Sequence, residues 1–308
     1  MDRALVFGTK GWGFESLPGR FMPKPLPQLQ PDHQHLYADP RVYDVLHAPG
    51  TRAEVSNLLR LARATLPAAP RQKLTFLEPA SGSGRYLLDL ARRGHAVRGL
   101  DLSDAMTAYA RAAATTLALK QRTTFITADM TRFGPADFAF GKPAPAPLAD
   151  VAFCTINSIR HLMTDRAMLD HLACVRACLR PGGVYIVGIE TSRPELAQAS
   201  EDVWVGTSRA TPRMKVHQMV SFIPPELGAK GRAARVEQVI SHLVISTPGQ
   251  PARHTDSVYQ LRTYTHQEWT AVLDRAGWDC LGIFNAEGTP RPQAILGYYL
   301  WVLRPRAV

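Results

Sequence analysis

Apolar residues in the middle of the chain occur in short continuous runs, and segments with helical spacing separate these runs. Continuous apolar runs of this length are typical of strands that are buried on both faces. The expected strands span residues 74–77, 96–100, 123–127, 151–155 and 184–189. The expected helices between them span residues 85–93, 104–116 and 165–179. Strands that alternate with helices in this way predict a mostly parallel sheet covered by helices on both faces.

Residues 191–262 interrupt the alternation of strands and helices. Strands joined by turns rich in proline and glycine are expected there at residues 215–222, 235–245 and 258–264. This pattern predicts an antiparallel insertion after the fifth strand. The chain then closes with a helix, for which Thr265 is the expected N-cap, and with two strands at 278–284 and 295–303.

The first 70 residues fall into two parts that differ in composition and periodicity. Residues 1–35 are rich in glycine and proline and show no periodicity, so we expect an irregular arm. From Tyr37 onward apolar residues recur at helical spacing until the prolines at 67 and 70. This spacing predicts a helical segment between the arm and the first strand.

The composition is that of an ordinary globular protein. Of the 308 residues, 45% are hydrophobic and 20% are charged, which excludes a wholly disordered chain, a collagen and a coiled coil. The formal net charge is +10, but the chain has no run of five or six like charges. The basic surplus therefore keeps nucleic acid open as a partner only if folding gathers it into a patch.

The cysteines and the N-terminal residues indicate a cytoplasmic protein without a metal site. Cys174 and Cys178 lie four residues apart, but no second Cys/His pair has matching spacing, so buried thiols in a reducing compartment are the favoured interpretation. The sequence has no stretch of 18 apolar residues, so it predicts no membrane span. The start of the chain carries Asp2 and lacks the apolar run of a secretory signal.

The sharpest local signal is the stretch Glu78-Pro79-Ala80-Ser81-Gly82-Ser83-Gly84 between a strand and a helix. A small-residue turn lets the backbone approach a ligand, and Asp101 at the end of the second strand suits a ribose diol. The dinucleotide fingerprint fails because Leu87 stands where a third glycine is needed. The charge of Glu78 also suits a cationic ligand better than a pyrophosphate. These residues therefore favour S-adenosylmethionine over NAD, and a methyltransferase over a dehydrogenase.

Four ordered motifs resemble the class I S-adenosylmethionine-dependent methyltransferases. They are the turn at 78–84 and the segments 99–106, 128–130 and 179–183. The turn departs from the family pattern at Ala80, where glycine is usual. The resemblance implies a Rossmann-like, doubly wound α/β fold whose mostly parallel sheet has seven strands, with the antiparallel insertion after strand five. It also implies S-adenosylmethionine as the cofactor.

The resemblance assigns cofactor contacts to Tyr43, Glu78, Ala80, Gly82, Gly84, Asp101, Leu102, Met106, Asp129, Met130 and Thr155. The glycine turn would border the methionine end, and Asp101 would hold the ribose hydroxyls. Asp129 would accept from the adenine amino group, although it could instead cap the next turn, and Met130 could instead belong to the core. Tyr37 or Tyr43, in a segment that resembles a methyltransferase lid, would face the sulfonium through a cation–π contact, with plain helix packing as the alternative.

The insertion resembles that of small-molecule N-methyltransferases, including those that act on nucleotide-linked amino sugars, and would roof the substrate pocket. A general base is needed only if the acceptor arrives protonated. His161 and Asn157, which follow strand four, are the candidate catalytic residues, although His161 could simply pack against a helix. Residues on the insertion that could also touch substrate are His217, His242, His254 and Tyr259.

The expected activity is methyl transfer to a nitrogen or oxygen of a small molecule by in-line displacement. An RNA or protein methyltransferase and a catalytically silent cofactor-binding scaffold are the alternatives. We expect no membrane partner, and homodimerisation stays open.

The expected organisation is an arm at 1–35 and one methyltransferase domain at 36–308. Within that domain we expect a helical lid (36–70), a cofactor-binding core (71–190), the roofing insertion (191–262) and a closing helix and hairpin (263–308).

Overall fold

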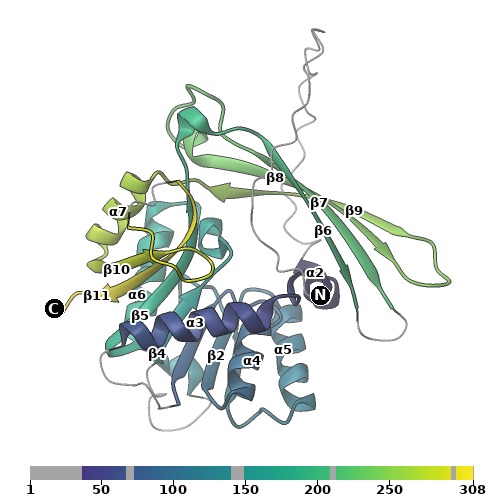
Figure 1. Ribbon diagram of the computed structural model, residues 1–308, viewed down its shortest axis with the longest axis horizontal. Coiled ribbons are helices and arrows are strands. Elements are labelled where there is room, and N and C mark those ends of the chain that lie inside the picture. The colour runs from purple at the N-terminus through teal and green to yellow at the C-terminus, as the bar shows by residue number, and fades with distance from the viewer. Residues whose placement is uncertain (1–36, 67–72, 140–148, 209–212, 293–295, 308) are drawn as a thin grey trace.

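The computed structural model describes residues 37–66, 73–139, 149–208, 213–292 and 296–307, and the predicted arm at 1–35 lies outside them. A seven-stranded sheet forms its centre (Figure 1). Its strands are β1 (Thr75–Pro79), β2 (Ala96–Asp101), β3 (Thr123–Thr127), β4 (Ala149–Cys154), β5 (Leu179–Thr191), β10 (Trp278–Phe284) and β11 (Gly297–Pro305). The strand order is β10-β11-β5-β4-β1-β2-β3. Only β11 runs against its neighbours, so the predicted doubly wound, mostly parallel sheet is confirmed.

Helices cover both faces of this sheet (Figure 1). The helices are α2 (Pro40–His47), α3 (Thr51–Thr65), α4 (Arg85–Arg92), α5 (Asp104–Thr116), α6 (Asp165–Cys178) and α7 (His266–Arg275). Apolar residues of α3, α4 and α5 pack with one face of the strands, and those of α6 and α7 pack with the other. Because both faces are covered, the central strands carry apolar residues at nearly every position.

Local capping places the helix starts where the sequence predicts them. Ser103 caps α5 by accepting from the amide of Met106, and Thr164 caps α6 by accepting from the amide of Ala167. Thr265 and Glu268 form a reciprocal capping box at the start of α7, with N–O distances of 3.0 and 3.1 Å. These caps satisfy backbone amides that the first helical turn leaves without partners.

The helical segment before β1 consists of two helices rather than the single one that its spacing predicts. The chain turns between α2 and α3 at Gly50, whose φ of 87° lies in the left-handed region. Pro49 precedes this glycine and has no amide hydrogen to continue α2. A Pro-Gly pair inside a helical pattern therefore ends one helix and allows the chain to change direction before the next.

The predicted insertion is a separate antiparallel sheet of four strands in the order β6-β7-β8-β9. Its strands are β6 (Ser200–Thr207), β7 (Lys215–Ile223), β8 (Val236–Ser246) and β9 (Arg253–Arg262). The sequence pattern missed β6 and placed the start of β9 five residues too late. Both strands lie at the edges of the sheet, where polar residues keep one side in water and pairing with the neighbour holds the backbone extended.

One face of this insertion sheet packs on helix α2. Val42, Val45 and Leu46 of α2 form a cluster with apolar residues of β7 and β8. A side chain at Gly206 of β6 would collide with the carbonyl oxygen of Val45, so glycine permits the close approach of lid and insertion. Helix α2 is therefore held against the insertion sheet.

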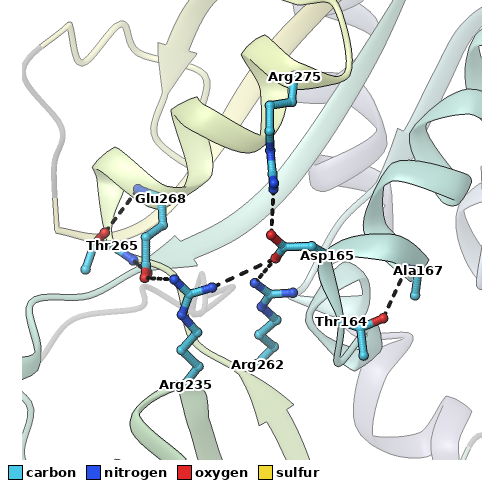
Figure 2. Close-up of polar contacts among 8 residues, drawn as sticks. All are labelled: Thr164, Asp165, Ala167, Arg235, Arg262, Thr265, Glu268 and Arg275. Carbon is cyan, nitrogen blue, oxygen red and sulfur yellow. Dashed lines mark hydrogen bonds and ion pairs between the residues drawn. The ribbon is translucent and has the colours of Figure 1, made fainter. Parts of the chain in front are cut away.

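An ionic cluster fastens the base of the insertion to the core (Figure 2). Asp165, the first residue of α6, pairs with Arg262 at the end of β9 and with Arg275 of α7, the latter at 2.6 Å. Arg235, just before β8, lies 3.9 Å from Asp165 and 2.7 Å from Glu268. Hydrogen bonds from Arg275 and Arg262 lower the pKa of Asp165 to about 2.

We expect Asp165→Asn to lower the free energy of unfolding by about 1–2 kcal/mol at pH 7, because it leaves the buried Arg262 guanidinium without its anionic partner. Asp165 is 39% exposed, so water screens part of the interaction. Its pKa is lower in the folded chain, so this stabilisation is complete above the unfolded-state pKa near 4 and disappears as pH falls toward 2.

Urea unfolding of wild type and Asp165→Asn at pH 7 and pH 2.5 tests this expectation. The difference between the two proteins should be present at pH 7 and mostly lost at the acid end. Asp170→Asn is the matched control, because Asp170 lies on the same helix and pairs only with the exposed Arg166. Equal losses for the two variants would contradict a special role of Asp165.

No helix in the described part of the chain is long and apolar enough to cross a membrane.

Candidate functional site

The glycine turn links β1 to α4 at the carboxyl edge of the central sheet. Its residues Ala80, Gly82 and Gly84 have φ values of 54°, 53° and 75°. A methyl group at Gly84 would lie 2.9 Å from the ring of Phe125, so only glycine fits there. Ala80 adopts the left-handed conformation that glycine adopts without strain, at a cost of about 1 kcal/mol. The departure from the family motif is therefore accommodated by a strained backbone rather than by a different turn.

Asp101, at the end of β2, accepts hydrogen bonds from the backbone on both sides of this site. One of its carboxylate oxygens accepts from the amide of Gly82 at 2.8 Å, and the other accepts from the amide of Ser103 at 2.9 Å. Burial raises the pKa of the Asp101 carboxyl, while the hydrogen bonds from Ser103 and Gly82 act in the opposite direction. The carboxylate thus ties the glycine turn to the start of α5, beside the position where the resemblance places the ribose.

Glu78 ends the hydrophobic run of β1 with a buried carboxylate. It is 4% exposed, and its Oε2 atom has no hydrogen-bond partner among the residues that the structure describes. Burial raises the pKa of Glu78 well above its usual value, an effect that the nearby Arg85 guanidinium opposes. A narrow recess lies beside it, lined by Tyr43, Glu78, Ala80, Ser81, Arg85, Tyr86, Thr155, Ile156 and Ser158. An unpartnered carboxylate oxygen at a recess is suited to a cationic group.

Helix α2 lies directly against the glycine turn. The ring of Tyr43 lies 3.5 Å from the point that a Cβ atom on Gly82 would occupy. Asp44, the next residue of α2, accepts hydrogen bonds from the hydroxyls of Ser83 and Tyr109. The role of Asp44 has no local signal in the sequence, because its partners in the turn and in α5 lie 39 and 65 residues away.

The residues expected at the adenine end lie at the carboxyl edges of β2 and β3. Leu102 is 75% exposed, whereas Met106 of α5 is 1% exposed. Asp129 Oδ1 accepts from both the amide and the hydroxyl of Thr131 at 2.8 Å, which is the capping geometry that was the alternative to adenine binding. Met130 packs against the core, and its carbonyl oxygen lies 2.8 Å from His171 Nδ1.

The segment after β4 carries two residues with unusual backbone conformations. Ile156 and Asn157 have φ values of 51° and 64°, and a positive φ at a β-branched residue is a genuine outlier. The side chain of Asn157 accepts from the amide of Glu190 at 2.7 Å, which joins this segment to the end of β5. Such strain clusters at functional sites, where the surrounding structure maintains it.

His161, in the short 3₁₀ helix Ser158–His161, lies between the lid and the insertion. Its ring stacks on Tyr259 of β9, with a centroid distance of 5.6 Å and an interplanar angle of 27°. Its Nε2 atom lies 3.5 Å from the hydroxyl of Tyr37. Three segments that are distant in sequence therefore meet at this histidine. Of the four candidates on the insertion, only Tyr259 reaches this place.

The three histidines of the insertion face away from His161. His217, His242 and His254 occupy the strand positions opposite to the face that packs on α2. His242 Nδ1 instead lies 2.5 Å from Asp256 at the exposed end of the sheet. They are therefore placed outside the site.

Arg160, the residue before His161, contacts the base of the insertion and pairs with two carboxylates. It is 3% exposed, donates to the carbonyl oxygen of Arg262 at 2.8 Å, and pairs with Glu237 at 2.7 Å and Glu190 at 3.5 Å. Burial raises the pKa of Glu190, and Arg160 opposes this shift. Glu190 and Glu237 carry no signal in the sequence, because nothing local links them to the segment after β4.

Comparisons with known proteins agree with this geometry. A protein-family profile described as a methyltransferase domain matches residues 76–183. The chain is 26% identical over 253 residues to a dTDP-3-amino-3,4,6-trideoxy-alpha-D-glucopyranose N,N-dimethyltransferase of Streptomyces venezuelae, covering 81% of this chain and 92% of the relative.

Two solved structures share the fold. An S-adenosylmethionine-dependent methyltransferase from Clostridium acetobutylicum superposes with a TM-score of 0.64 at 13% identity, covering 86% of this chain and 97% of that one. DesVI from Streptomyces venezuelae superposes with a TM-score of 0.63 at 20% identity, covering 90% and 100% of the two chains.

The residues of the site suit S-adenosylmethionine chemically. The unpartnered carboxylate oxygen of Glu78 suits a cationic group, and a carboxylate at the end of the second strand, such as that of Asp101, suits a ribose diol. The profile match begins in β1 and spans the glycine turn, Asp101 and the segment that carries His161. The chain thus contains a methyltransferase domain at residues 76–183 and is an enzyme that uses S-adenosylmethionine to transfer a methyl group.

Proposed function

We propose that the enzyme methylates an amino group of a small, sugar-like acceptor that binds between the central sheet and the insertion. The observation that carries this proposal is the stacking of Tyr259 on His161, since it brings the roof onto the segment that follows β4. The relative from Streptomyces venezuelae is named for N,N-dimethylation of a nucleotide-linked amino sugar. Two carboxylates, Glu190 and Glu237, pair with Arg160, the residue before His161, and carboxylates near the acceptor would suit a cationic amine better than a neutral hydroxyl.

The cofactor, when bound, supplies an electrophilic methyl group with an excellent leaving group. We infer that Glu78 and the turn Ala80–Gly84 hold its methionine end and that Asp101 holds its ribose hydroxyls. Tyr43 of the lid already lies on the turn, where its ring face suits a sulfonium. In the same proposal Thr155 borders the transferred group, and Leu102, Met106, Asp129 and Met130 surround the adenine.

The chain's own residues would prepare the acceptor. An amine is protonated near neutral pH and cannot attack until it loses a proton. His161 would take that proton on its imidazole ring, and Tyr37, whose hydroxyl lies 3.5 Å from Nε2, would orient the ring. Asn157 would keep the segment in place through its bond to the Glu190 amide. The roof would exclude water while the nucleophile and the methyl group are held in line.

We also propose the division of labour expected from the sequence: a lid at 36–70, a cofactor core at 71–190, a roof at 191–262 and a closing unit at 263–308. The proposed partners are a small-molecule acceptor and a second copy of this chain. A reducing, cytoplasmic location suits the four free cysteines, of which Cys154 and Cys178 are buried.

A pair of matched acceptors tests this function. We expect a dTDP-linked 3-amino sugar to gain one or two methyl groups in the presence of S-adenosylmethionine, and its 3-hydroxy counterpart to gain none. Mass spectrometry of both products is the measurement. Methylation of the hydroxy sugar alone, or of RNA or a protein instead of either sugar, would exclude the amine acceptor. Cofactor binding without turnover of any acceptor would favour a scaffold.

A further inference from the structure

Three buried polar side chains interrupt the face of the insertion sheet that packs on α2, which we name the inner face. Gln218 of β7, Ser241 of β8 and Ser257 of β9 are 1%, 0% and 4% exposed. Cross-strand partners point to the same face of a sheet, as do residues two apart on one strand. Gln218 pairs with Leu243, which belongs to the cluster that packs on α2. Ser241, two residues before Leu243, pairs with Ser257, so the three side chains share the inner face, and we name them the polar row.

The polar row has hydrogen-bonding capacity that the protein does not use. Gln218 Nε2 donates to Ser241 Oγ at 2.8 Å, so the glutamine side chain reaches from β7 over β8. Gln218 Oε1 and Ser257 Oγ, however, have no hydrogen-bond partner within the described part of the chain. A buried polar atom without a partner lowers stability, so its presence in a folded protein requires an explanation. One open carbonyl oxygen and one open hydroxyl are suited to hydroxyl groups of a ligand.

Packing of the insertion sheet does not require polar residues at these positions. The other buried side chains of the inner face are apolar on both sides of the polar row. They are Val216, Leu243 and Ile245 on one side and Val220, Val239 and Leu261 on the other. Apolar side chains at all three positions of the row would continue this surface and leave no polar atom without a partner. A bound ligand therefore explains the polarity of the row better than folding does.

The polar row lies between an open cavity and His161. Tyr259, two residues after Ser257 on the same face of β9, stacks on His161. In the other direction Thr255, two residues before Ser257, lines a cavity of about 520 Å³ between the starts of α2 and α5 and the insertion sheet. Two strand residues span about 7 Å, so the row can contact groups next to an atom held at His161. A cavity of this size admits a small ligand.

We propose that Gln218 and Ser257 determine acceptor specificity by binding the two hydroxyl groups that flank the methylated amine. The inference rests on the proposed function, because it takes the acceptor amine to lie at His161. Two open polar atoms call for two hydroxyls, one on each carbon next to the amine-bearing carbon. The relative from Streptomyces venezuelae is named for a 3-amino-3,4,6-trideoxy sugar, which has no hydroxyl at C4 beside its amine. The acceptor of this enzyme carries that hydroxyl.

Two acceptors that differ in one hydroxyl test this specificity. They are the dTDP-linked 3-amino-3,4,6-trideoxy sugar and its 4-hydroxy counterpart. We expect the wild type to prefer the 4-hydroxy sugar by at least about 100-fold in kcat/KM, because a site that hydrogen-bonds a hydroxyl rejects an analogue that leaves its buried groups unpaired. The double variant Gln218→Met/Ser257→Ala should reduce this preference to less than about 5-fold. A defect of packing would instead lower the rates with both sugars alike.

Gln238→Met is the matched control. Gln238 also lies on the insertion sheet, but it precedes the inner-face residue Val239 and so points to the opposite face. This variant should keep the wild-type preference, and calorimetry should show equal S-adenosylmethionine affinity in all three proteins. A wild type that uses both sugars equally, or a preference that the double variant retains, would overturn the hydroxyl subsite and leave the proposed function intact. Methylation of neither sugar would overturn both.

Discussion

Replacing Asp101 with alanine is expected to weaken S-adenosylmethionine binding by at least about 100-fold. The substitution removes the carboxylate proposed to hold the ribose hydroxyls, and hydrogen bonds to a charged group contribute about 1.5–3 kcal/mol each. It also leaves the amides of Gly82 and Ser103 without their acceptors, so the glycine turn loses its tie to the start of α5. Both effects act on binding in the same direction. Isothermal titration calorimetry with the cofactor measures the loss.

Two companion variants separate binding from folding in this test. Asp101→Asn keeps the shape and one acceptor oxygen, so its affinity should lie between those of wild type and Asp101→Ala. Asp104→Ala is the matched control, because Asp104 is exposed in the first turn of α5, three residues away. Thermal unfolding of each variant shows whether the fold is intact. Wild-type affinity in a folded Asp101→Ala would contradict the proposed ribose contact.

The central sheet could be predicted from the sequence because its strands are buried on both faces. Phe76 and Leu77 of β1, which point to opposite sides, belong to the two separate core clusters. Burial on both sides produces continuous apolar runs that stand out in a single sequence. The edge strand β6 produces no such signal, since Ser200, Glu201 and Asp202 open it and only pairing with β7 keeps it extended.

Cofactor-site residues were more predictable than those of the proposed acceptor side. Glu78, the glycine turn and Asp101 lie within 24 residues of one another, and their spacing follows directly from a strand–turn–helix unit. By contrast, Tyr259 meets His161 from 98 residues away, and Glu237 meets Arg160 from 77 residues away. These pairs depend on how the insertion sheet folds back over the core, which local patterns do not specify.

The second large effect is expected for His161→Gln, which should lower kcat by about 10²–10⁴-fold while changing KM little, as loss of a general base does. The defect should be greatest near neutral pH, where the amine acceptor arrives protonated. It should shrink as pH rises above the pKa of the acceptor, because the free amine no longer needs a base. Initial rates from pH 6 to 10 with the amino acceptor measure this dependence.

Variants at Tyr259 and His254 measure what the stack on His161 contributes, and the pH profile of His161→Gln shows whether the histidine acts on a proton. Tyr259→Phe keeps the ring that stacks on His161 and should retain most activity, whereas Tyr259→Ala removes the stack and should raise KM. His254→Gln, at an exposed position on the face of the insertion sheet that points away from α2, should leave the rates unchanged. If His161→Gln loses the same fraction of activity at every pH, the histidine positions the acceptor and takes no proton. Alkaline recovery is expected only if it acts as the base.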